Sequence, residues 1–158
     1  ELYNHSKIKA MGSLTKREGF GRPLLEFTQT QKPIIASNWS GQVDFLNPEF
    51  ASLVPGTLTP IHPSAQVKDM LIEGTQWFTV DYGFVGGLLK DYFENYKKYK
   101  DKGKRLAYYC KNNFSFEKMQ EKLDTILTAN VPEFPKQVSL VLPKLKRIEL
   151  PKLSKVKP

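Results

Sequence analysis

The chain has 158 residues, a net charge of +8, 40% hydrophobic residues, 25% charged residues and one cysteine. This balance is typical of one folded domain with a core, and no apolar run approaches the roughly 20 residues that a membrane helix needs. The single cysteine, Cys110, excludes an intramolecular disulfide and a zinc site of several cysteines. We therefore expect a cytoplasmic protein without a bound metal, in which Cys110 has a packing role.

In chain order, the first predicted elements are two short apolar strands joined by a helix. The strands cover residues 8–14 and 34–37. Between them lie a glycine-rich loop, 15–21, and a helix that begins at Pro23 and ends near Gln31. Proline is well suited to the first turn of a helix. Strand, loop, helix and strand within about 30 residues indicate a βαβ unit, which belongs to a parallel sheet.

The next predicted elements are shorter, and the last ones are helical. We expect a short helix near 43–46, extended structure over 53–58 broken by a Pro-Gly turn, and another short helix over 64–73. Apolar and aromatic residues from Leu88 to Tyr99 recur at helical spacing, and Gly103 is expected to end that helix. A further helix is expected over 105–111. The last helix is capped by Ser115 and presents one apolar face, made by Phe116, Met119, Leu123, Ile126 and Leu127.

The predicted fold class is α/β. Residues 1–131 are expected to form part of a Rossmann-like domain, with parallel strands, crossover helices and C-terminal helices. Residues 132–158 are expected to form an extended tail rich in proline and lysine.

The basic charge is concentrated in the predicted tail. Residues 136–158 carry seven basic residues and one acid, which leaves +2 on the other 135 residues. The tail also contains alternating aliphatic residues, so association with a protein partner or with a second copy is one interpretation and a solvated terminus is the other. Nucleic acid is not an expected partner of the tail, because it has no aromatic residue after Phe134 for base stacking.

The loop over 15–21 carries the residues with the clearest chemical potential. Parallel sheets bind ligands at the carboxyl ends of their strands, which is where this loop is expected to lie. Gly19 and Gly21 would allow an anion to approach the backbone closely. Glu18 could accept a hydrogen bond from a sugar, and Glu26 from the hydroxyls of a ribose. The alternative is that Glu18 caps the helix and Glu26 is a solvated helix residue.

Residues 13–26, Ser-Leu-Thr-Lys-Arg-Glu-Gly-Phe-Gly-Arg-Pro-Leu-Leu-Glu, resemble the Glu-x7-Glu signature of a known family. The family is the group 1 retaining glycosyltransferases with two Rossmann-like domains (GT-B type). Residues 32–38 and the Ser40-Gly41 pair resemble the next strand and glycine turn of that family. The resemblance covers roughly residues 1–128, and its motif core is the specific part.

The resemblance implies transfer of a sugar from a nucleotide-sugar donor to an unknown acceptor with retention of configuration, without a metal or other cofactor. It implies that Glu18 is the catalytic-site residue that contacts the donor sugar, and that Gly19, Phe20 and Gly21 lie against the sugar and diphosphate. It also implies that the backbone of Leu24 and Leu25 passes near the donor and that Glu26 binds the ribose.

The basic residues with which the family holds the diphosphate precede its motif strand. They therefore have no counterpart in these 158 residues. The expectation is thus the C-terminal, donor-binding portion of such an enzyme. The alternative is a non-catalytic structural or assembly protein built on the same kind of domain and attached to its partner through the basic tail.

Overall fold

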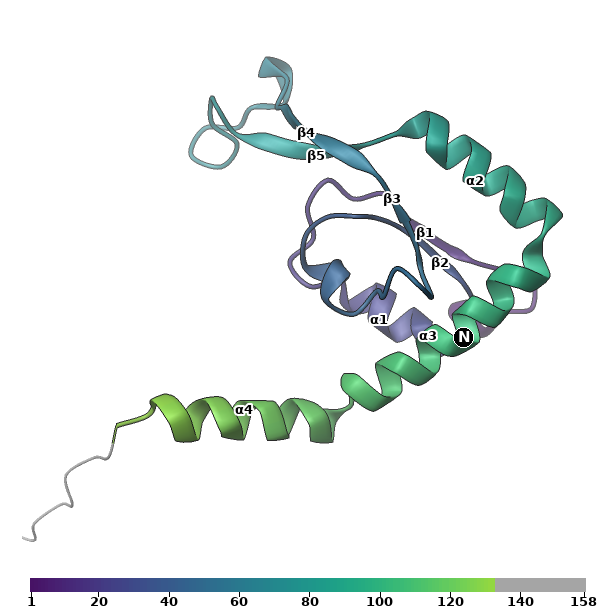
Figure 1. Cartoon of the computed structure of the whole chain (residues 1–158). Helices are drawn as coiled ribbons and strands as arrows, with labels where there is room; N and C mark the ends of the chain where they lie inside the picture. Colours follow the sequence, from purple (N-terminus) through teal and green to yellow (C-terminus); the bar gives the residue numbers. More distant parts are fainter. Residues whose placement is uncertain (133–158) are drawn as a thin grey trace, which may run out of the picture.

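The computed structural model describes residues 1–132 (Figure 1). The tail predicted for 132–158, and the partner role predicted for 136–158, therefore lie outside the described residues apart from Pro132. Within the described part the fold is mixed α/β, with a parallel three-stranded sheet, an antiparallel pair of strands and four α-helices. The predicted α/β class is confirmed at this level.

The parallel sheet has the strand order β1-β2-β3. Its strands are β1 (Met11–Ser13), β2 (Ile34–Ser37) and β3 (Ser52–Val54), and α1 (Arg22–Thr28) connects the first two. The predicted βαβ unit is thus confirmed, with elements shorter than the apolar runs suggested. At the start of the first run, the N–H of Ile8 donates to a turn carbonyl at 3.0 Å, so the strand begins later.

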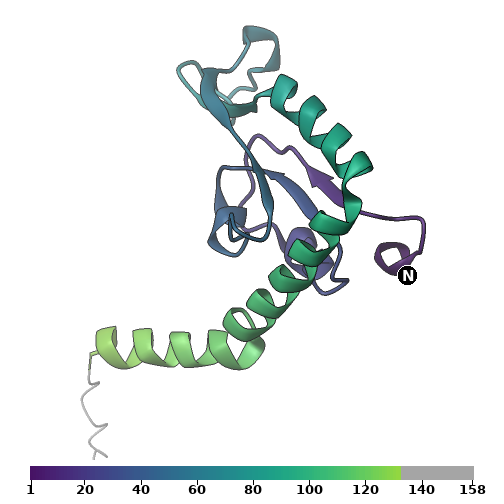
Figure 2. The same cartoon turned by 45° about the vertical axis from the view of Figure 1, so that its right-hand side comes forward.

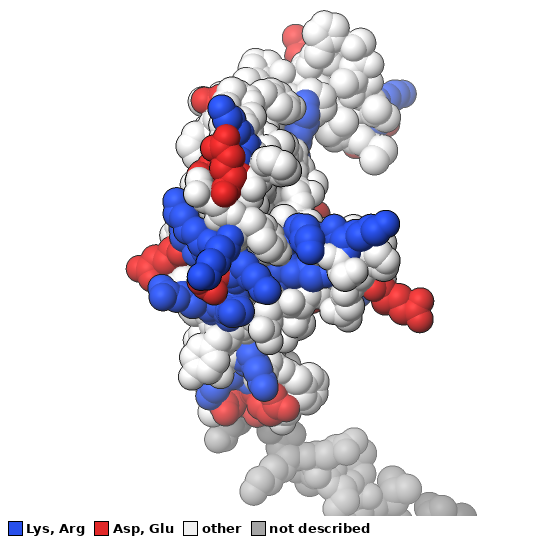
Figure 3. Space-filling model, turned by 90° about the vertical axis from the view of Figure 1, so that its right-hand side faces the viewer, with Lys and Arg blue, Asp and Glu red and all other residues white. Residues whose placement is uncertain are grey.

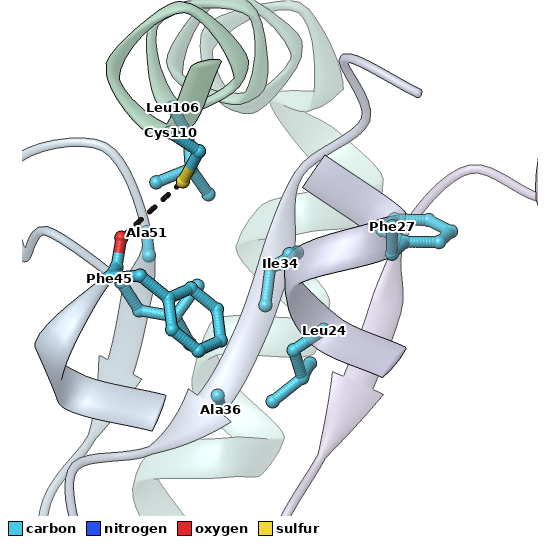
Figure 4. Packing of buried hydrophobic residues seen from close by; sticks show 9 residues of the cluster. Leu24, Phe27, Ile34, Ala36, Phe45, Ala51, Leu106 and Cys110 are labelled. Atoms are coloured by element: carbon cyan, nitrogen blue, oxygen red, sulfur yellow. Dashed lines mark hydrogen bonds between the residues drawn. The ribbon is translucent and has the colours of Figure 1, made fainter. Parts of the chain in front are cut away.

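Each face of the sheet is covered by a different set of elements. All four residues of β2 are buried, and alternate residues point to opposite faces, as in any strand. Ile34 and Ala36 pack in a cluster with α1 and with α3 (Tyr96–Asn113), as Figure 4 shows for this core. Ile35 packs in a second cluster with residues from β5 (Gln76–Val80) and from α2 (Tyr82–Glu94). Continuous burial of β2 fits a parallel sheet covered on both faces.

The region after β3 differs from the sequence prediction. The extended segment is confirmed, because β4 (Gly56–Pro60) follows β3 after Pro55 and pairs with β5. The predicted Pro-Gly turn is wrong, because Gly56 is already the first residue of β4 and Pro55 only separates the two strands. The helix predicted over 64–73 is wrong. A 3₁₀ helix, η3 (Pro63–Ala65), is followed by an isolated bridge between Val67 and Leu71, and Asp69 between them has a φ of 62°. A left-handed residue within a tight reversal cannot continue a helix.

The two other 3₁₀ helices lie near predicted elements. The first, η1 (Leu2–Asn4), opens the chain. The second, η2 (Gly41–Asp44), begins two residues before the short helix predicted near 43–46 and overlaps it.

The helix boundary predicted at Gly103 is also wrong. The helix is interrupted at Asn95, which separates α2 from α3, and α3 continues through Gly103. A Cβ at Gly103 would lie 2.7 Å from the carbonyl carbon of Lys32 and 2.8 Å from the nitrogen of Pro33. Glycine therefore stands here because α3 passes close to the backbone before β2, and it does not end the helix.

The last helix, α4 (Phe116–Asn130), begins as predicted. The hydroxyl of Ser115 caps it by accepting a hydrogen bond from the N–H of Lys118 at 3.3 Å. All of its residues are exposed, and it extends away from the sheet and the other helices in both views (Figures 1 and 2). The predicted apolar face is present in the sequence of α4, but no described element packs on it. None of the helices described is long and apolar enough to cross a membrane.

Candidate functional site

The loop between β1 and α1 lies at the carboxyl end of the sheet and is fastened to the loop after β2. The Ser40 hydroxyl accepts from the N–H of Glu18 at 3.2 Å and donates to the Glu18 carbonyl at 2.5 Å. The N–H of Gly41 donates to the same carbonyl at 3.0 Å. The backbone of Glu18 is thus held from both sides by the Ser-Gly pair that follows β2.

Gly41 also fits tightly against the neighbouring loop. A Cβ at Gly41 would lie 2.7 Å from the carbonyl carbon of Gly19 and 2.9 Å from the Cα of Phe20, both backbone atoms. Gly19 itself faces open space, since an added Cβ there would meet nothing within 4 Å. One side of this loop is therefore packed and the other side is accessible. Ser40, with a φ of 71°, adopts an uncommon backbone conformation to make this contact.

Gly21 starts α1 in the left-handed conformation, with a φ of 88°. Its carbonyl accepts from the N–H groups of Leu24 at 2.9 Å and Leu25 at 3.1 Å, and Pro23, which precedes Leu24, has no N–H. The first turn of α1 therefore has few amides left for an anion. Since the N–H of Glu18 already donates to Ser40, an anion bound here would take its backbone donors from residues 19–22.

The predicted site residues fall into two groups by burial. Leu24 is buried and Leu25 is half-buried, so both side chains pack in the core, whereas Phe20 is exposed and its ring lies 5.3 Å from that of Phe45. Glu18 is half-buried and Glu26 is exposed. Thus the structure brings Glu18 and the Gly19-Phe20-Gly21 turn together at the surface, and it places the leucine side chains beneath them.

The two glutamates have different surroundings. The carboxylate of Glu26 pairs with Arg22 one turn earlier, at 3.4 Å, and both side chains are largely in water. An exposed pair of this kind contributes little to stability, so Glu26 can exchange its partner at small cost. No hydrogen bond or ion pair of the Glu18 carboxylate occurs among residues 1–132. Both carboxylates can therefore accept hydrogen bonds from the hydroxyl groups of a ligand.

A buried polar network, which the sequence analysis did not predict, lies under the loop. The Gln42 amide donates to the Ser37 carbonyl at 2.9 Å and to the Ser37 hydroxyl at 2.8 Å, and that hydroxyl donates to the Thr15 carbonyl at 2.8 Å. Gln42 is completely buried, and among residues 1–132 neither its Oε1 nor the Thr15 hydroxyl has a hydrogen-bond partner. The network links the end of β2 to both loops. Its only sequence signal is a polar residue directly after the Ser-Gly pair.

The opposite side of the loop contacts β5. The Nζ of Lys16 lies 3.4 Å from the ring centre of Trp77, and the Lys16 carbonyl accepts from the N–H of Phe78 at 3.2 Å. Trp39, from the loop after β2, stacks on Phe78 with the ring centres 5.5 Å apart. Trp39 thus packs against β5, while Trp77 is half-buried and covered by a lysine.

Cys110 belongs to the core, as its isolation in the sequence predicts. It is buried, and its thiol donates to the Phe45 carbonyl at 3.6 Å (Figure 4). Burial raises the pKa of this thiol to about 11, which keeps it protonated and unreactive near neutral pH. Among residues 1–132, no three His, Cys, Asp or Glu side chains are grouped as metal ligands.

Comparison of the chain with protein-family models, curated proteins and solved structures gives no match. The class that the described residues define is therefore a mixed α/β protein with a parallel three-stranded sheet, whose carboxyl end carries a packed glycine loop and two accessible glutamates.

Proposed function

We propose that the chain is the donor-binding portion of a retaining glycosyltransferase of the two-Rossmann-domain type and that it binds a nucleotide-sugar. The observation that carries the proposal is the position of the Glu18-to-Glu26 motif. It lies directly after a parallel strand, and parallel sheets bind ligands at that end. A Rossmann-like arrangement and a cytoplasmic location are part of this proposal.

In this proposal each end of the motif has a separate task. Glu18 accepts hydrogen bonds from the sugar, while the open side of Gly19 lets the diphosphate approach the backbone. Glu26 leaves its exposed contact with Arg22 and accepts from the ribose hydroxyls. Leu24 and Leu25 contribute by packing the helix under the loop, because their amides are already bonded to Gly21.

The motif also supports a role for the Ser40-Gly41 pair. Their contacts with the Glu18 carbonyl keep the loop in place before a donor arrives. A preorganised loop binds more tightly, because less conformational entropy is lost on binding. Ser40 and Gly41 are thus positioning residues in the proposed site.

Titration calorimetry with nucleotide-sugars that differ in base and sugar, and with the matching free nucleoside diphosphates, tests the proposal. Glu26→Gln should lower the affinity for both kinds of ligand roughly tenfold, because both carry the ribose. Glu18→Gln should weaken the nucleotide-sugar and leave the free nucleotide unchanged. Gly19→Ala should lower the affinity for both kinds of ligand, because both carry the diphosphate. It should not lower the stability of the chain, since its methyl group enters open space.

A glutamate outside the motif supplies the matched control. Glu49→Gln removes the same charge from an exposed loop residue and should leave all affinities unchanged. If the three motif variants bind every ligand as the unaltered chain does, the loop is not the donor site and the proposal fails.

The second candidate function is a non-catalytic assembly role, which one observation favours. The exposed apolar residues of α4, among them Phe116 and Leu123, form the kind of surface that marks protein interaction sites. Light scattering over a range of chain concentrations tests self-association. A monomer at all concentrations, with Leu123→Glu behaving identically, would argue against it.

A further inference from the structure

The amino end of the parallel sheet, opposite the candidate donor site, carries a hollow surrounded by lysines. Lys9 lies two residues before β1 and Lys32 two residues before β2, so both stand at the starts of their strands. Together with Lys100 and Lys104 of α3 they line a hollow of about 310 Å³. A space of this size is at the lower end of small-molecule pockets, which are roughly 300–1,000 Å³.

Within the described part of the chain, no acidic side chain lines this hollow. Its other polar lining groups include Thr30 and Gln31, from the turn between α1 and β2. Lys104 pairs with Asp101 at 3.4 Å outside the lining, while Lys9 and Lys100 make no ion pair within residues 1–132. Lys9 and Lys100 therefore lack a counter-charge among residues 1–132, while Lys104 keeps its pair with Asp101.

Fixed backbone contacts hold the walls of the hollow. The Nζ of Lys32 donates to the carbonyls of Tyr3 at 2.6 Å and His5 at 3.0 Å, which fastens the N-terminal segment over the turn. The Tyr96 hydroxyl donates to the Lys9 carbonyl at 2.9 Å and ties that residue to α3. Gln31 has a φ of 59°, an uncommon conformation that shapes the turn. Defined contacts of the fold therefore place these lysines around one hollow.

The same charge extends over the surrounding surface. Helix α3 carries seven basic residues and one acid, and Figure 3 shows lysine and arginine side chains gathered in a band across this face of the molecule. A concave region rimmed by cations of one sign concentrates anions from solution. Lysine ammonium groups bind phosphate as point charges. Several of them around one space therefore favour a ligand with more than one negative charge over a ligand with a single carboxylate.

We propose that this lysine hollow, defined by Lys9, Lys32, Lys100 and Lys104, binds a soluble ligand that carries two or more phosphate charges. The site is separate from the donor site proposed above, because it lies at the other end of the strands. The proposal does not depend on glycosyltransferase activity.

Calorimetric titration of the full 158-residue chain with pyrophosphate, at constant ionic strength, tests the proposal. The key variant is Lys9→Gln/Lys100→Gln, in which two exposed lysines of the lining lose their charge and the anchored Lys32 is kept. Its affinity for pyrophosphate should fall at least tenfold. The matched control is Lys97→Gln/Lys102→Gln, which removes the same charge from α3 outside the lining and should change the affinity less than twofold.

Three outcomes would overturn the proposal. The first is an absence of saturable pyrophosphate binding. The second is an equal loss of affinity in both double variants, which would mean diffuse attraction without a site. The third is binding restricted to vesicles of anionic phospholipid or to a single-stranded oligonucleotide, which would mean that the charged face serves a larger surface or polymer. Retention of pyrophosphate binding by Glu18→Gln separates this test from the test of the donor site.

Discussion

At the carboxyl end of the parallel sheet the loops after β1 and β2 meet through backbone atoms, whereas at the amino end the segments before the same strands bring lysine side chains together. Glu18, Ser40 and Gly41 meet at van der Waals and hydrogen-bond distances, so that end depends on shape. Lys9 and Lys100 flank an open hollow, so the other end depends on charge. The two ends should therefore respond to different changes: the first to a single methyl group, the second to charge removal and salt.

The largest expected effect comes from Gly41→Ala. Its methyl group would overlap the backbone of Gly19 and Phe20, and backbone cannot move aside as a flexible side chain can. We expect a loss of about 3 kcal/mol in the free energy of unfolding, measured by urea denaturation. Gly19→Ala is the matched control and should change stability by less than about 0.5 kcal/mol. Equal stability of the two variants would show that the loops do not touch as described.

The buried network beneath the loop gives the next largest effect. Gln42→Leu removes the two hydrogen bonds to Ser37 and leaves its carbonyl without that donor, while it also removes the unpaired Oε1. We expect a net loss of about 2 kcal/mol, because an unpaired buried polar group costs more than a hydrogen bond gains. Urea denaturation measures it. Gln42→Glu should lose more stability than Gln42→Leu, since its carboxylate cannot donate to Ser37. An unchanged free energy of unfolding in both variants would show that the network does not stabilise the fold.

Two substitutions of Ser40 separate the hydrogen bond from the backbone conformation. Ser40→Ala loses the contacts to Glu18 and keeps the left-handed φ of 71°, and should cost about 1–2 kcal/mol. Ser40→Gly loses the same contacts and relieves the conformation, so it should cost less than alanine. Thermal unfolding of both variants in parallel measures the difference. A larger loss of stability in Ser40→Gly than in Ser40→Ala would show that the backbone of Ser40 is not strained.

The smallest expected effect on stability is at the amino end. Lys9→Gln/Lys100→Gln should alter the free energy of unfolding by less than about 0.5 kcal/mol, because both side chains are exposed and make no ion pair among residues 1–132. At low salt the change should favour the folded state, since two repelling charges are gone, and it should vanish as added salt screens them. A loss above 1 kcal/mol would show that these lysines have a structural role, and the contrast between the two ends would disappear.

The local patterns of the sequence predicted the first half of the fold well. Apolar runs, a proline in the first helical turn and two glycines indicated the βαβ unit, because these signals act over a few residues. The helix end predicted at Gly103 is wrong for a different reason. A glycine that ends a helix and a glycine that allows close packing look alike in a sequence, and only the partner 70 residues earlier, at Lys32 and Pro33, distinguishes them.

The candidate site was predictable in its exposed residues and not in its support. Glu18 and the glycines stood out by type and spacing. The contacts of Ser40 and Gln42 join segments 22 and five residues apart, through a backbone carbonyl and a buried amide that no local pattern encodes. The lysine hollow was missed as well, because its members come from three separate segments that meet only in the folded chain.

The close approach of Gly103 to the Lys32–Pro33 backbone also fixes the distance between α3 and the central strand. The contact joins α3 to the start of β2 without an intervening side chain, so the position of α3 and the position of the central strand depend on each other. Gly103→Ala would act as a wedge at this joint, widening the lysine hollow and tilting β2 together.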